Sequence, residues 1–587
     1  MPSKYVLSFK PAIGLYGQHD PSAAIFANGE LQYAIEEERL TRNKHAPDTF
    51  PRRAIEACLE YEGINLSDVS KVILPYNPKL RRKIIGHYLR DTLRIDSHLR
   101  KLSHLQNVVE DQVIAQFLPT HAVEARLEQL GTPVPPIECR SHHACHAVSA
   151  FHPSQFDEAL VLTVDAKGEY DSTVVWHGTP DHLERLHTYE HPNSWGLFYA
   201  VITEYLGYRM FNGEGKVMGL APYGTENHKI ERTLRDVIDT GVDYDVTALT
   251  RRWGTEYGIK KLEELFDRPR SNTTEEFDQF EKDLAYTTQK LLEESVTDIA
   301  QTYCEELGTG NVGLAGGVVL NCKLNKAIME LPVVDDVFIQ PVANDAGLAL
   351  GGGWIDRRPK EVDPMETVYT GPEFTTDKIS PLLEETKVEY GKPDDLEQTV
   401  AELLADGALV GWFQGRLEFG PRALGNRSIL ADPRTADSRD RVNKFVKHRE
   451  EWRPFAPSLL EEAASEYFEN ATSAPYMIRT FDVRPEKQDE IEAVLHPADA
   501  TTRPQTVHAD QNSRYYRLID EFEEITGVPV LLNTSFNDHA EPIVATPAEA
   551  LKAFHGMGLD VLVLEDLVVT KPKSRYSLDS EAITKTT

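Results

Sequence analysis

Residues 159–177 read ALVLTVDAKGEYDSTVVWH, and this stretch decides the fold. An apolar run leads through a polar turn at 167–169 into a second apolar run, which is the pattern of two strands joined by a tight connection. Residues 313–328, GLAGGVVLNCKLNKAI, add a strand, a Gly-Gly turn and the start of a helix. Together these stretches predict an α/β domain whose polar turns could clamp a nucleotide.

A comparable strand pair opens the chain. YVLSF at 5–9 precedes a loop with His19 and Asp20, and SAAIFANGELQYAI at 22–35 contains Asn-Gly, a strong hairpin turn. Two such units predict a duplicated α/β core. Strand pairs joined by a polar turn of this size are also how actin-like ATPases grip nucleotide phosphates, although hairpins are common in other folds.

The chain is long and acidic. Its 587 residues carry a formal net charge of -32, and 41% of them are hydrophobic. This length predicts about two to four folding units, and the hydrophobic content suffices for packed domains. The negative charge disfavours nucleic acid or an anionic membrane as the main partner, and it would suit a salt-rich cytoplasm.

Cysteine usage and the N-terminal segment bear on location. The five cysteines lack CxxC spacing, which indicates neither a disulfide framework nor a cysteine zinc site and fits a reducing cytoplasm. The opening MPSKYVLSFKPAIG lacks a basic start followed by a long apolar stretch. We therefore expect a cytoplasmic protein without a membrane partner, and the chain could form a homodimer.

The chain is expected to divide near residue 360. Gly-Gly-Gly, Asp-Arg-Arg-Pro and Asp-Pro elements gather at 351–371 and mark a change of unit. We expect a first domain at 1–360, a second at 361–575 and a frayed polar tail at 576–587. The elements expected in them are a core helix within 275–307, strands at 408–413, 528–532 and 560–564, and acidic helices such as 394–405.

A basic island lies in the second domain. Residues 416–457 contain ten Arg or Lys against six Asp or Glu. In so acidic a chain, this island predicts an anion site for phosphate or carboxylate. Its candidate residues are Arg422, Arg427, Arg434, Lys447 and Arg449. The alternative is a solvated surface with ordinary ion pairs, but GPRALG holds Arg422 between a proline and a small-residue turn.

A pair of histidines suggests a metal site. In SHHACHAVSAF at 141–151, His142 and His146 are four residues apart, so on a helix they project from the same face. Asp165 and Asp345, each after an apolar strand, could complete the ligand shell. Two histidines and two aspartates suit iron, zinc or manganese. A purely structural histidine pair is the alternative.

Two further segments could contact a ligand. NGEGKVMGLAPYG at 212–224 surrounds a lysine with glycines, which frees backbone N–H groups for phosphate, although it could equally be a tight turn and is not a Walker P-loop. VPVLLNTSFN at 528–537 ends in neutral hydrogen-bonding groups, as a substrate rim or a strand cap would. Arg503, beside a turn, could close over an anion.

The chain resembles the carbamoyltransferase family that includes the nodulation-factor, cephamycin and tobramycin O-carbamoyltransferases. The resemblance spans nearly the whole chain, and its ordered motifs are HDPSAA, EEERLTRNKH, HHACHAVSAF, GEGKVMGLAPYG, GGVVLNCKLN, NDAG, EFGPRALGNRSILADPR, REEWRPFAP and LLNTSFN. It implies an α/β chain with an N-terminal actin-like ATPase (ASKHA, TsaD-like) domain followed by an α/β YrdC-like domain.

The resemblance also implies a reaction. The YrdC-like domain would make carbamoyl-adenylate from carbamoyl phosphate and ATP, with Mg²⁺ accompanying the ATP, and the TsaD-like domain would transfer the carbamoyl group to a hydroxyl of a small-molecule acceptor. Both substrates are polyanions, so joining them requires cations that neutralise their repulsion. The family's metal is iron.

The site residues implied by the resemblance fall into three groups. The metal ligands would be His142, His146, Asp165 and Asp345. The catalytic residues would be His19, Arg422 and Lys447, with His19 as general base for the acceptor hydroxyl; a structural loop histidine is the alternative. The substrate- and nucleotide-binding residues would be Lys44, Gly213, Gly215, Lys216, Gly316, Gly317, Asn321, Arg427, Arg449, Arg503, Thr534, Ser535 and Asn537. Ala166 departs from the family, which usually has glycine after this aspartate.

Two other functions stay open. A tRNA threonylcarbamoylation enzyme would use related domains, but it should carry a sizeable basic surface, whereas these cations cluster within motifs that small anions would occupy. A non-catalytic nucleotide-binding sensor should have lost the metal and anion residues, yet they are present. The acceptor itself is not readable from the sequence.

Overall fold

The computed structural model describes residues 4–83, 120–251, 255–274, 276–450, 452–538, 540–571 and 576. The chain divides into two compact units, which are considered separately. The N-terminal unit comprises residues 1–41 and 45–365, and the C-terminal unit comprises residues 42–44 and 366–587. The boundary between the two units lies between residues 365 and 366, a few residues after the expected boundary near 360. Apart from Tyr576, the predicted tail at 576–587 lies outside the described residues.

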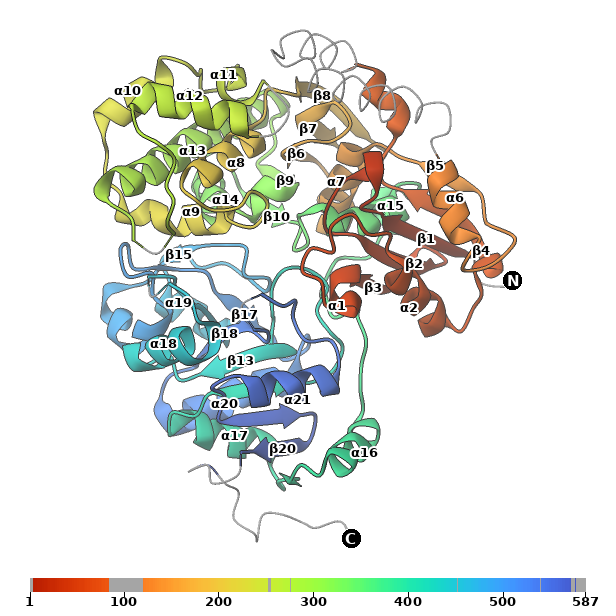
Figure 1. The fold of residues 1–587 in the computed structure, drawn as a ribbon, viewed down its shortest axis with the longest axis vertical. Helices are drawn as coiled ribbons and strands as arrows, with labels where there is room; N and C mark the ends of the chain where they lie inside the picture. Colours follow the sequence, from red (N-terminus) through yellow and green to blue (C-terminus); the bar gives the residue numbers. More distant parts are fainter. Residues whose placement is uncertain are drawn as a thin grey trace. The chain divides into compact units, whose positions relative to one another are not determined.

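The N-terminal unit contains two five-stranded sheets with the same topology (Figure 1). In each, the first three strands form an antiparallel meander and two later strands join in parallel beside the first. The first sheet has the order β3-β2-β1-β4-β5, with β1 Tyr5–Lys10, β2 Ser22–Ala27, β3 Glu30–Glu36, β4 Val69–Leu74 and β5 Ile137–Cys139. The second has the order β10-β9-β6-β7-β8, with β6 Ala159–Val164, β7 Asp171–Gly178, β8 Leu183–Glu190, β9 Asn311–Ala315 and β10 Asp336–Ile339. Both predicted strand pairs, and the duplicated α/β core, are confirmed.

Two helices cross between the repeated halves. Helix α7, His142–Phe151, follows the first sheet in the chain but packs its Ala147, Ala150 and Phe151 on β6, β7 and β9 of the second. Helix α15, Leu348–Trp354, follows the second sheet but packs on β1, β2 and β4 of the first. The two helices also contact each other. Each half therefore provides a helix that covers the sheet of the other half.

The glycine triplet at 351–353 does not mark the change of unit, so this part of the boundary argument was wrong. All three glycines lie inside α15, where each permits a close approach. A Cβ on Gly351 would lie 1.8 Å from the Cys145 carbonyl oxygen of α7. Cβ atoms on Gly352 and Gly353 would lie 2.4 Å from Ser8 Oγ and 1.9 Å from the Phe26 ring. The glycines serve packing of α15 against α7, β1 and β2.

The Gly351→Ala variant is expected to lose stability although alanine is the better helix former. The helix preference contributes about 1 kcal/mol in favour of alanine, whereas a methyl group forced into a backbone carbonyl costs roughly 1–3 kcal/mol or more. We expect a lower urea midpoint than for the wild type. Gly215→Ala is the matched control, because its Cβ would meet nothing within 4 Å in another short helix. Equal midpoints for both variants would contradict this packing role.

The remaining helices of the N-terminal unit are largely amphipathic. The longest is α13, Gln279–Leu307, which begins at a capping box formed by Asp278 and Glu281 and ends at Gly308 in the left-handed conformation. The predicted core helix is thereby confirmed, while residue 275 lies outside the described residues. The others are α1 Glu37–Thr41, α2 Arg52–Glu62, α6 His121–Leu127, α8 Trp195–Tyr205, α9 Glu214–Leu220, α10 His228–Arg235, α11 Thr247–Thr250, α12 Glu256–Phe266 and α14 Cys322–Met329.

The C-terminal unit is built on one eight-stranded mixed sheet of order β11-β20-β19-β12-β13-β18-β14-β17. Its strands are β11 Tyr390–Gly391, β12 Val410–Phe413, β13 Arg427–Ala431, β14 Ala456–Leu460, β17 Gln505–Val507, β18 Val530–Ser535, β19 Val561–Leu564 and β20 Leu567–Thr570. A separate pair is β15 Phe481–Asp482 and β16 Thr501–Thr502. The helices are α16 Thr376–Thr386, α17 Leu396–Ala405, α18 Ala436–Val442, α19 Ala464–Tyr467, α20 Ser513–Thr526 and α21 Pro547–Gly556. The three predicted strands and the helix predicted at 394–405 are confirmed.

Candidate functional site

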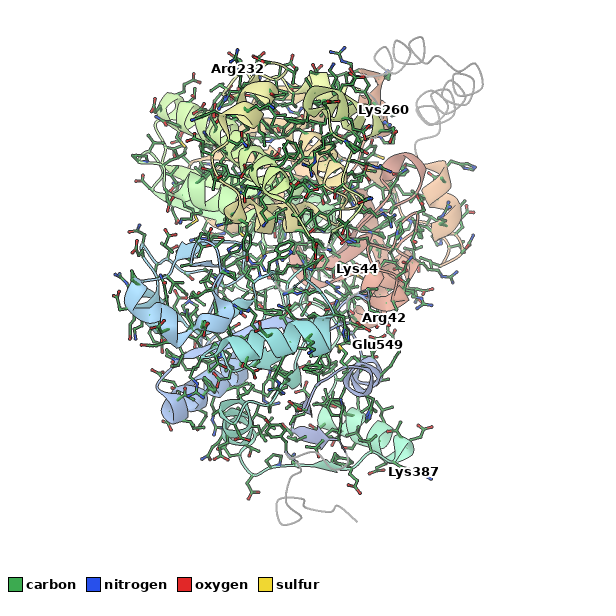
Figure 2. All side chains as sticks on the ribbon, turned by 60° about the vertical axis from the view of Figure 1, so that its left-hand side comes forward. Arg42, Lys44, Arg232, Lys260, Lys387 and Glu549 are labelled. Atoms are coloured by element: carbon green, nitrogen blue, oxygen red, sulfur yellow. The ribbon has the colours of Figure 1, made fainter. Side chains whose placement is uncertain are left out.

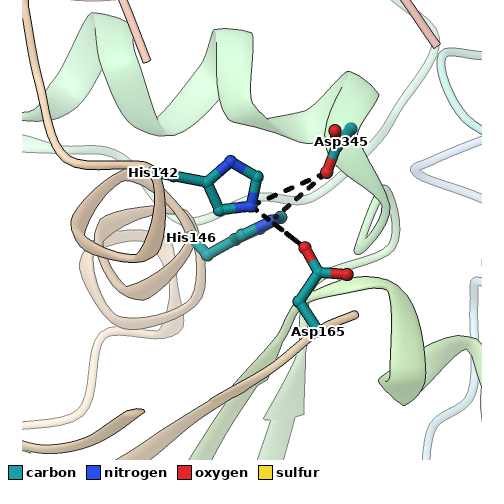
Figure 3. A group of neighbouring side chains, drawn as sticks. All are labelled: His142, His146, Asp165 and Asp345. Atoms are coloured by element: carbon teal, nitrogen blue, oxygen red, sulfur yellow. Dashed lines mark hydrogen bonds and ion pairs between the residues drawn. The ribbon is translucent and has the colours of Figure 1, made fainter. Parts of the chain in front are cut away.

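A cluster of four side chains lies in the N-terminal unit, where the two repeated halves meet (Figure 3). His142 and His146 are one turn apart on α7 and project together. Asp165 follows the buried strand β6, and Asp345 opens a short 3-10 helix just before α15. One ligand atom from each residue lies within 4.8 Å of the others. The structure thus brings together the four residues predicted as metal ligands.

The distances within this cluster leave room for an ion. His142 Nε2 lies 3.0 Å from Asp165 Oδ2 and 3.7 Å from Asp345 Oδ1. His146 Nε2 lies 3.5 Å and 3.9 Å from the same two oxygens. Both His146 ring nitrogens are buried without a hydrogen-bond partner. An orphaned imidazole facing two carboxylates is a donor set that fits a borderline divalent metal such as iron, zinc or manganese.

The histidines and aspartates of the cluster shift one another's pKa values. Burial lowers the pKa of His142, but the negative charges of Asp345 and Asp165 outweigh it and raise that pKa to about 9. Burial lowers the pKa of His146. Burial raises the pKa of Asp165, yet the hydrogen bond with His142 and the positive charge of the two histidines hold it well below its usual value.

Lys10 links the cluster to the loop that carries His19. Its ammonium group is buried, lies 2.9 Å from Asp345 Oδ2 and donates to the His19 carbonyl oxygen. Gly17, with φ of +117°, allows this approach, because its Cβ would lie 3.0 Å from Lys10 Nζ. Lys10 therefore occupies one oxygen of Asp345 and leaves the other to the cluster.

His19 is held by a neighbouring carboxylate. Its Nδ1 lies 3.0 Å from Asp20 Oδ2, and the other Asp20 oxygen lies 2.8 Å from His45 Nδ1. If Nδ1 of His19 donates to Asp20, its Nε2 is the nitrogen that can accept a proton. The Phe211 ring packs on the His19 ring with 4.8 Å between centroids, and Phe211 has a left-handed φ of 60°. This geometry suits an oriented base.

The segment 213–224 folds differently from the loop that the glycines predicted. Residues Glu214–Leu220 form α9 with Gly213 as N-cap, so the N–H groups of its later turns bond within the helix. Lys216 Nζ lies 4.9 Å from the centre of the Tyr208 ring. The expected glycine-rich loop is therefore corrected to a helix, because Glu214, Lys216, Val217 and Met218 favour a helix even between glycines. Phosphate binding by Gly213, Gly215 and Lys216 stays a prediction.

Gly316, Gly317 and Asn321 lie next to the metal-ligand cluster or at a helix start. Gly316 has φ of +98°, and its Cβ would meet the Val164 carbonyl oxygen at 2.3 Å. A Cβ on Gly317 would lie 3.1 Å from Asp165 Oδ1. Asn321 caps α14 and exchanges hydrogen bonds with Gln289. Ala166 itself is accommodated by Gly196, whose Cβ would lie 2.6 Å from the Ala166 Cα.

In the C-terminal unit, Lys447 is the centre of a second site. It ends a π-helix, Asn443–Lys447, which continues α18; π-helices are rare and frequent at functional sites. Its ammonium group is buried and contacts four oxygen atoms, those of Ser535 and Asn537, at 2.6–3.3 Å. Burial and the positive charges of Arg449, Lys44 and Arg453 hold its pKa well below the usual value.

The same site gathers cations that repel one another. Burial, and to a smaller extent the positive charges of Arg453 and Arg503, lower the pKa of Arg449 well below its usual range. The negative charge of Glu450 opposes that shift. We call Lys44, Lys447, Arg449, Arg453 and Arg503 the cation cluster; all five belong to the C-terminal unit. Residues 42–44 are anchored there by Arg42, which donates to the carbonyls of Pro542 and Ile543 and lies 3.5 Å from Glu549 (Figure 2). A group of cations around a buried lysine is stabilised by an anion.

Arg453 was missed at the sequence level, and two arginines of the basic island have other roles. Arg427 is fully buried, donates to the carbonyls of Gln414, Gly415, Asn426 and Pro372, and stacks on Phe413 at 3.5 Å. The expectation that it binds an anion directly is corrected to support of the surrounding loop. Arg434 pairs with Asp432. Only the position of Arg453 within REEWRPFAP could have signalled its role.

The remaining predicted residues lie at the end of β18 or on the loop before β13. Ser535 ends β18 and contacts Lys447, while Thr534, one residue earlier, pairs with Ile429 of β13. Asn537 also contacts Lys447 and donates to the Glu541 carbonyl. Arg422 lies on the loop between Glu418 and β13. The polar end of β18 therefore supports the lysine rather than merely capping the strand.

Comparisons with known proteins agree on a family. The family model described as the carbamoyltransferase N-terminus matches residues 12–353, and the model described as the carbamoyltransferase C-terminus matches residues 401–571. The chain belongs to the carbamoyltransferase family. It is a transferase by family, and the resemblance read from the motifs is confirmed.

Individual relatives extend over nearly the whole chain. An uncharacterized protein of Synechocystis is 36% identical over 94% of this chain and 95% of its own length. Nodulation protein NolNO of Sinorhizobium fredii is 37% identical over 94% of this chain and 79% of its own length. Among solved structures, full-length HypF in the phosphate- and nucleotide-bound form is 13% identical over 60% of this chain and 55% of its own, with a TM-score of 0.30.

In the described part of the chain, no helix is long and apolar enough to cross a membrane.

Proposed function

We propose that the chain is an ATP-dependent O-carbamoyltransferase that makes carbamoyl-adenylate in its C-terminal unit and transfers the carbamoyl group in its N-terminal unit. The observation that carries the proposal is the cation cluster, in which buried Lys447 and partly buried Arg449 lie among further positive charges. Carbamoyl phosphate and ATP are polyanions that such a cluster would neutralise. ATP would arrive with Mg²⁺.

The activation chemistry follows from charge. Loss of phosphate from carbamoyl phosphate, with uptake of water, gives carbamate. A carbamate oxygen then attacks the α-phosphorus of ATP and displaces pyrophosphate, which leaves carbamoyl-adenylate. In this proposal Arg422, Lys447, Arg449 and Arg503 hold the phosphate groups, and Ser535 and Asn537 orient Lys447.

The transfer step belongs to the N-terminal unit, for which we propose an actin-like (ASKHA, TsaD-like) fold from the repeated 3-2-1-4-5 strand order, with a YrdC-like fold for the C-terminal unit. The acceptor oxygen attacks the carbamoyl carbon, AMP leaves, and Nε2 of His19 takes the hydroxyl proton while Asp20 holds the ring. His142, His146, Asp165 and Asp345 would hold a divalent metal, for which iron is the first candidate. When bound, such a metal supplies Lewis-acid polarisation of a carbonyl or phosphoryl oxygen.

Isotope exchange tests the activation half. Metal-loaded protein is expected to exchange labelled pyrophosphate into ATP only when carbamoyl phosphate is supplied, because only then can the adenylate form and revert. The control is the same mixture with inorganic phosphate in place of carbamoyl phosphate. No exchange by intact, metal-loaded protein would refute the adenylate mechanism. The acceptor is then sought among small hydroxyl compounds by the mass of one added carbamoyl group.

Retention of both residue sets favours catalysis over a non-catalytic sensor. The four candidate metal ligands converge, and the cation cluster is assembled from separate segments of the C-terminal unit. The tRNA-modifying alternative has no observation in its favour in the described residues. Cytoplasmic location and a homodimer stay predictions.

A further inference from the structure

The backbone of the loop that carries Arg422 is hydrogen-bonded to a buried carboxylate, that of Glu418. Glu418 is 1% exposed. Its Oε1 accepts backbone N–H groups from Leu424, Asn426 and Arg427 at 2.9, 2.7 and 3.0 Å. Three converging N–H groups are the usual backbone cradle for an anion. Here the anion in the cradle is Glu418, so these N–H groups are not available to a phosphate.

The carbonyl groups of the loop are held as well. Gln505 and Tyr369 donate to the Leu424 oxygen at 2.8 and 2.7 Å. Trp412 and Gln414 donate to the Gly425 oxygen at 2.9 and 3.0 Å. The backbone from 424 to 427 is therefore bound on both its donor and its acceptor sides.

The conformation of the loop requires glycine at position 425. Its φ is +96°, and a Cβ there would lie 2.2 Å from the Tyr515 ring. Tyr515 is fully buried. The loop thus sits directly on the core of the unit in a conformation that only glycine permits.

Charge completes the support. At the far end of the loop, buried Arg427 donates to carbonyl oxygens. Burial lowers the pKa of Arg427 to about 10, and the negative charge of Glu418 is the largest of the contributions that oppose this shift. Buried Glu418 and buried Arg427 therefore carry opposite charges within the same loop. Their burial keeps both groups away from a substrate.

We propose that Glu418 is a positioning residue that fixes the loop so that Arg422 meets a phosphate group of carbamoyl phosphate or ATP. Arg422 is the one cation in the sequence between Gly420 and Gly425. A fixed backbone reduces the ordering that the arginine must undergo when it binds an oxyanion. The proposal rests on the proposed function, because it assigns a role within the same anion site.

A double-mutant cycle tests it. Glu418→Gln keeps the shape of the side chain but removes the charge that organises three N–H groups, and it is expected to raise the KM for carbamoyl phosphate or for ATP in the exchange assay about tenfold, with kcat within about threefold. In the Arg422→Met background the same substitution should change that KM less than about twofold. Glu384→Gln, exposed on α16, is the control and should match the wild type.

The outcomes are separable. Equal effects of Glu418→Gln in both backgrounds, or no effect in the wild type, would overturn the positioning role. If Glu418→Gln does not fold, Glu418→Asp, which keeps the charge but shortens the reach, takes its place in the cycle. If wild-type protein shows no exchange, the proposed function has failed, and the cycle is measured on pyrophosphate affinity by calorimetry. Additive losses of affinity, or no pyrophosphate binding by the wild type, would then overturn the inference.

Discussion

Replacing His142 and His146 together with alanine is expected to abolish carbamoyl transfer while leaving pyrophosphate exchange intact. The two imidazoles are half of the donor set that converges with Asp165 and Asp345, and without them the site cannot hold a metal. A Lewis acid contributes several kcal/mol to a transition state, so transfer should fall by on the order of 10³-fold. In the proposed mechanism exchange takes place in the other unit, so it should stay within about threefold. Product is measured by mass, and bound metal by elemental analysis.

The control for this variant is His177→Ala. His177 lies on β7 of the same unit and pairs with exposed Glu158, outside the cluster. It should retain metal and transfer. Active wild-type protein that contains no metal would refute the metal site, and equal loss of exchange and transfer in the double variant would refute the division of labour between the units.

Replacing Lys447 with methionine is expected to remove most of the exchange activity. A charge-assisted hydrogen bond to phosphate contributes about 1.5–3 kcal/mol, so the KM for carbamoyl phosphate or ATP should rise roughly 10- to 100-fold. Pyrophosphate should also raise the Tm of the wild type, because it neutralises the mutual repulsion of Lys447, Arg449 and Arg453. The variant should show a smaller rise. Enzyme kinetics and scanning calorimetry make the two measurements.

Lys444→Met is the matched control, because Lys444 lies on the same π-helix but is exposed. It removes the same formal charge and should change neither the KM nor the pyrophosphate-induced rise in Tm beyond about twofold and about 1 °C. Identical behaviour of the Lys444 and Lys447 variants would show that general charge, and not the cation cluster, attracts the anion.

The sequence was most informative where local periodicity or strand ends decide the outcome. The spacing of His142 and His146 needs only one helical turn to bring their rings together. Asp165 directly follows the buried strand β6, and Asp345 comes after β10. Because neighbouring parallel strands end at the same edge of a sheet, β6 and β9, with β10 beside them, bring such residues near each other. These features could be predicted from the chain alone.

The remaining features depend on tertiary contacts that no short pattern contains. In the sequence, glycines at 351–353 indicate a change of unit, but they lie inside α15, where the backbone of α7 and the side chains of Ser8 and Phe26 approach closely. The role of Arg427 could not be read from its charge, since four carbonyl groups from three segments surround it. Glu418 gave no signal at all, because its three N–H partners become visible only once the loop is folded.

The exchange of covering helices between the two sheets has a consequence for synthesis of the protein. The first sheet is complete in the chain at β5, but α15, which packs on β1, β2 and β4, begins only at Leu348. Contacts this distant in sequence form late, and apolar surface stays open until they do. During synthesis, the first sheet is therefore expected to keep apolar surface exposed until α15 has been translated. We do not expect either half to fold as a separate fragment.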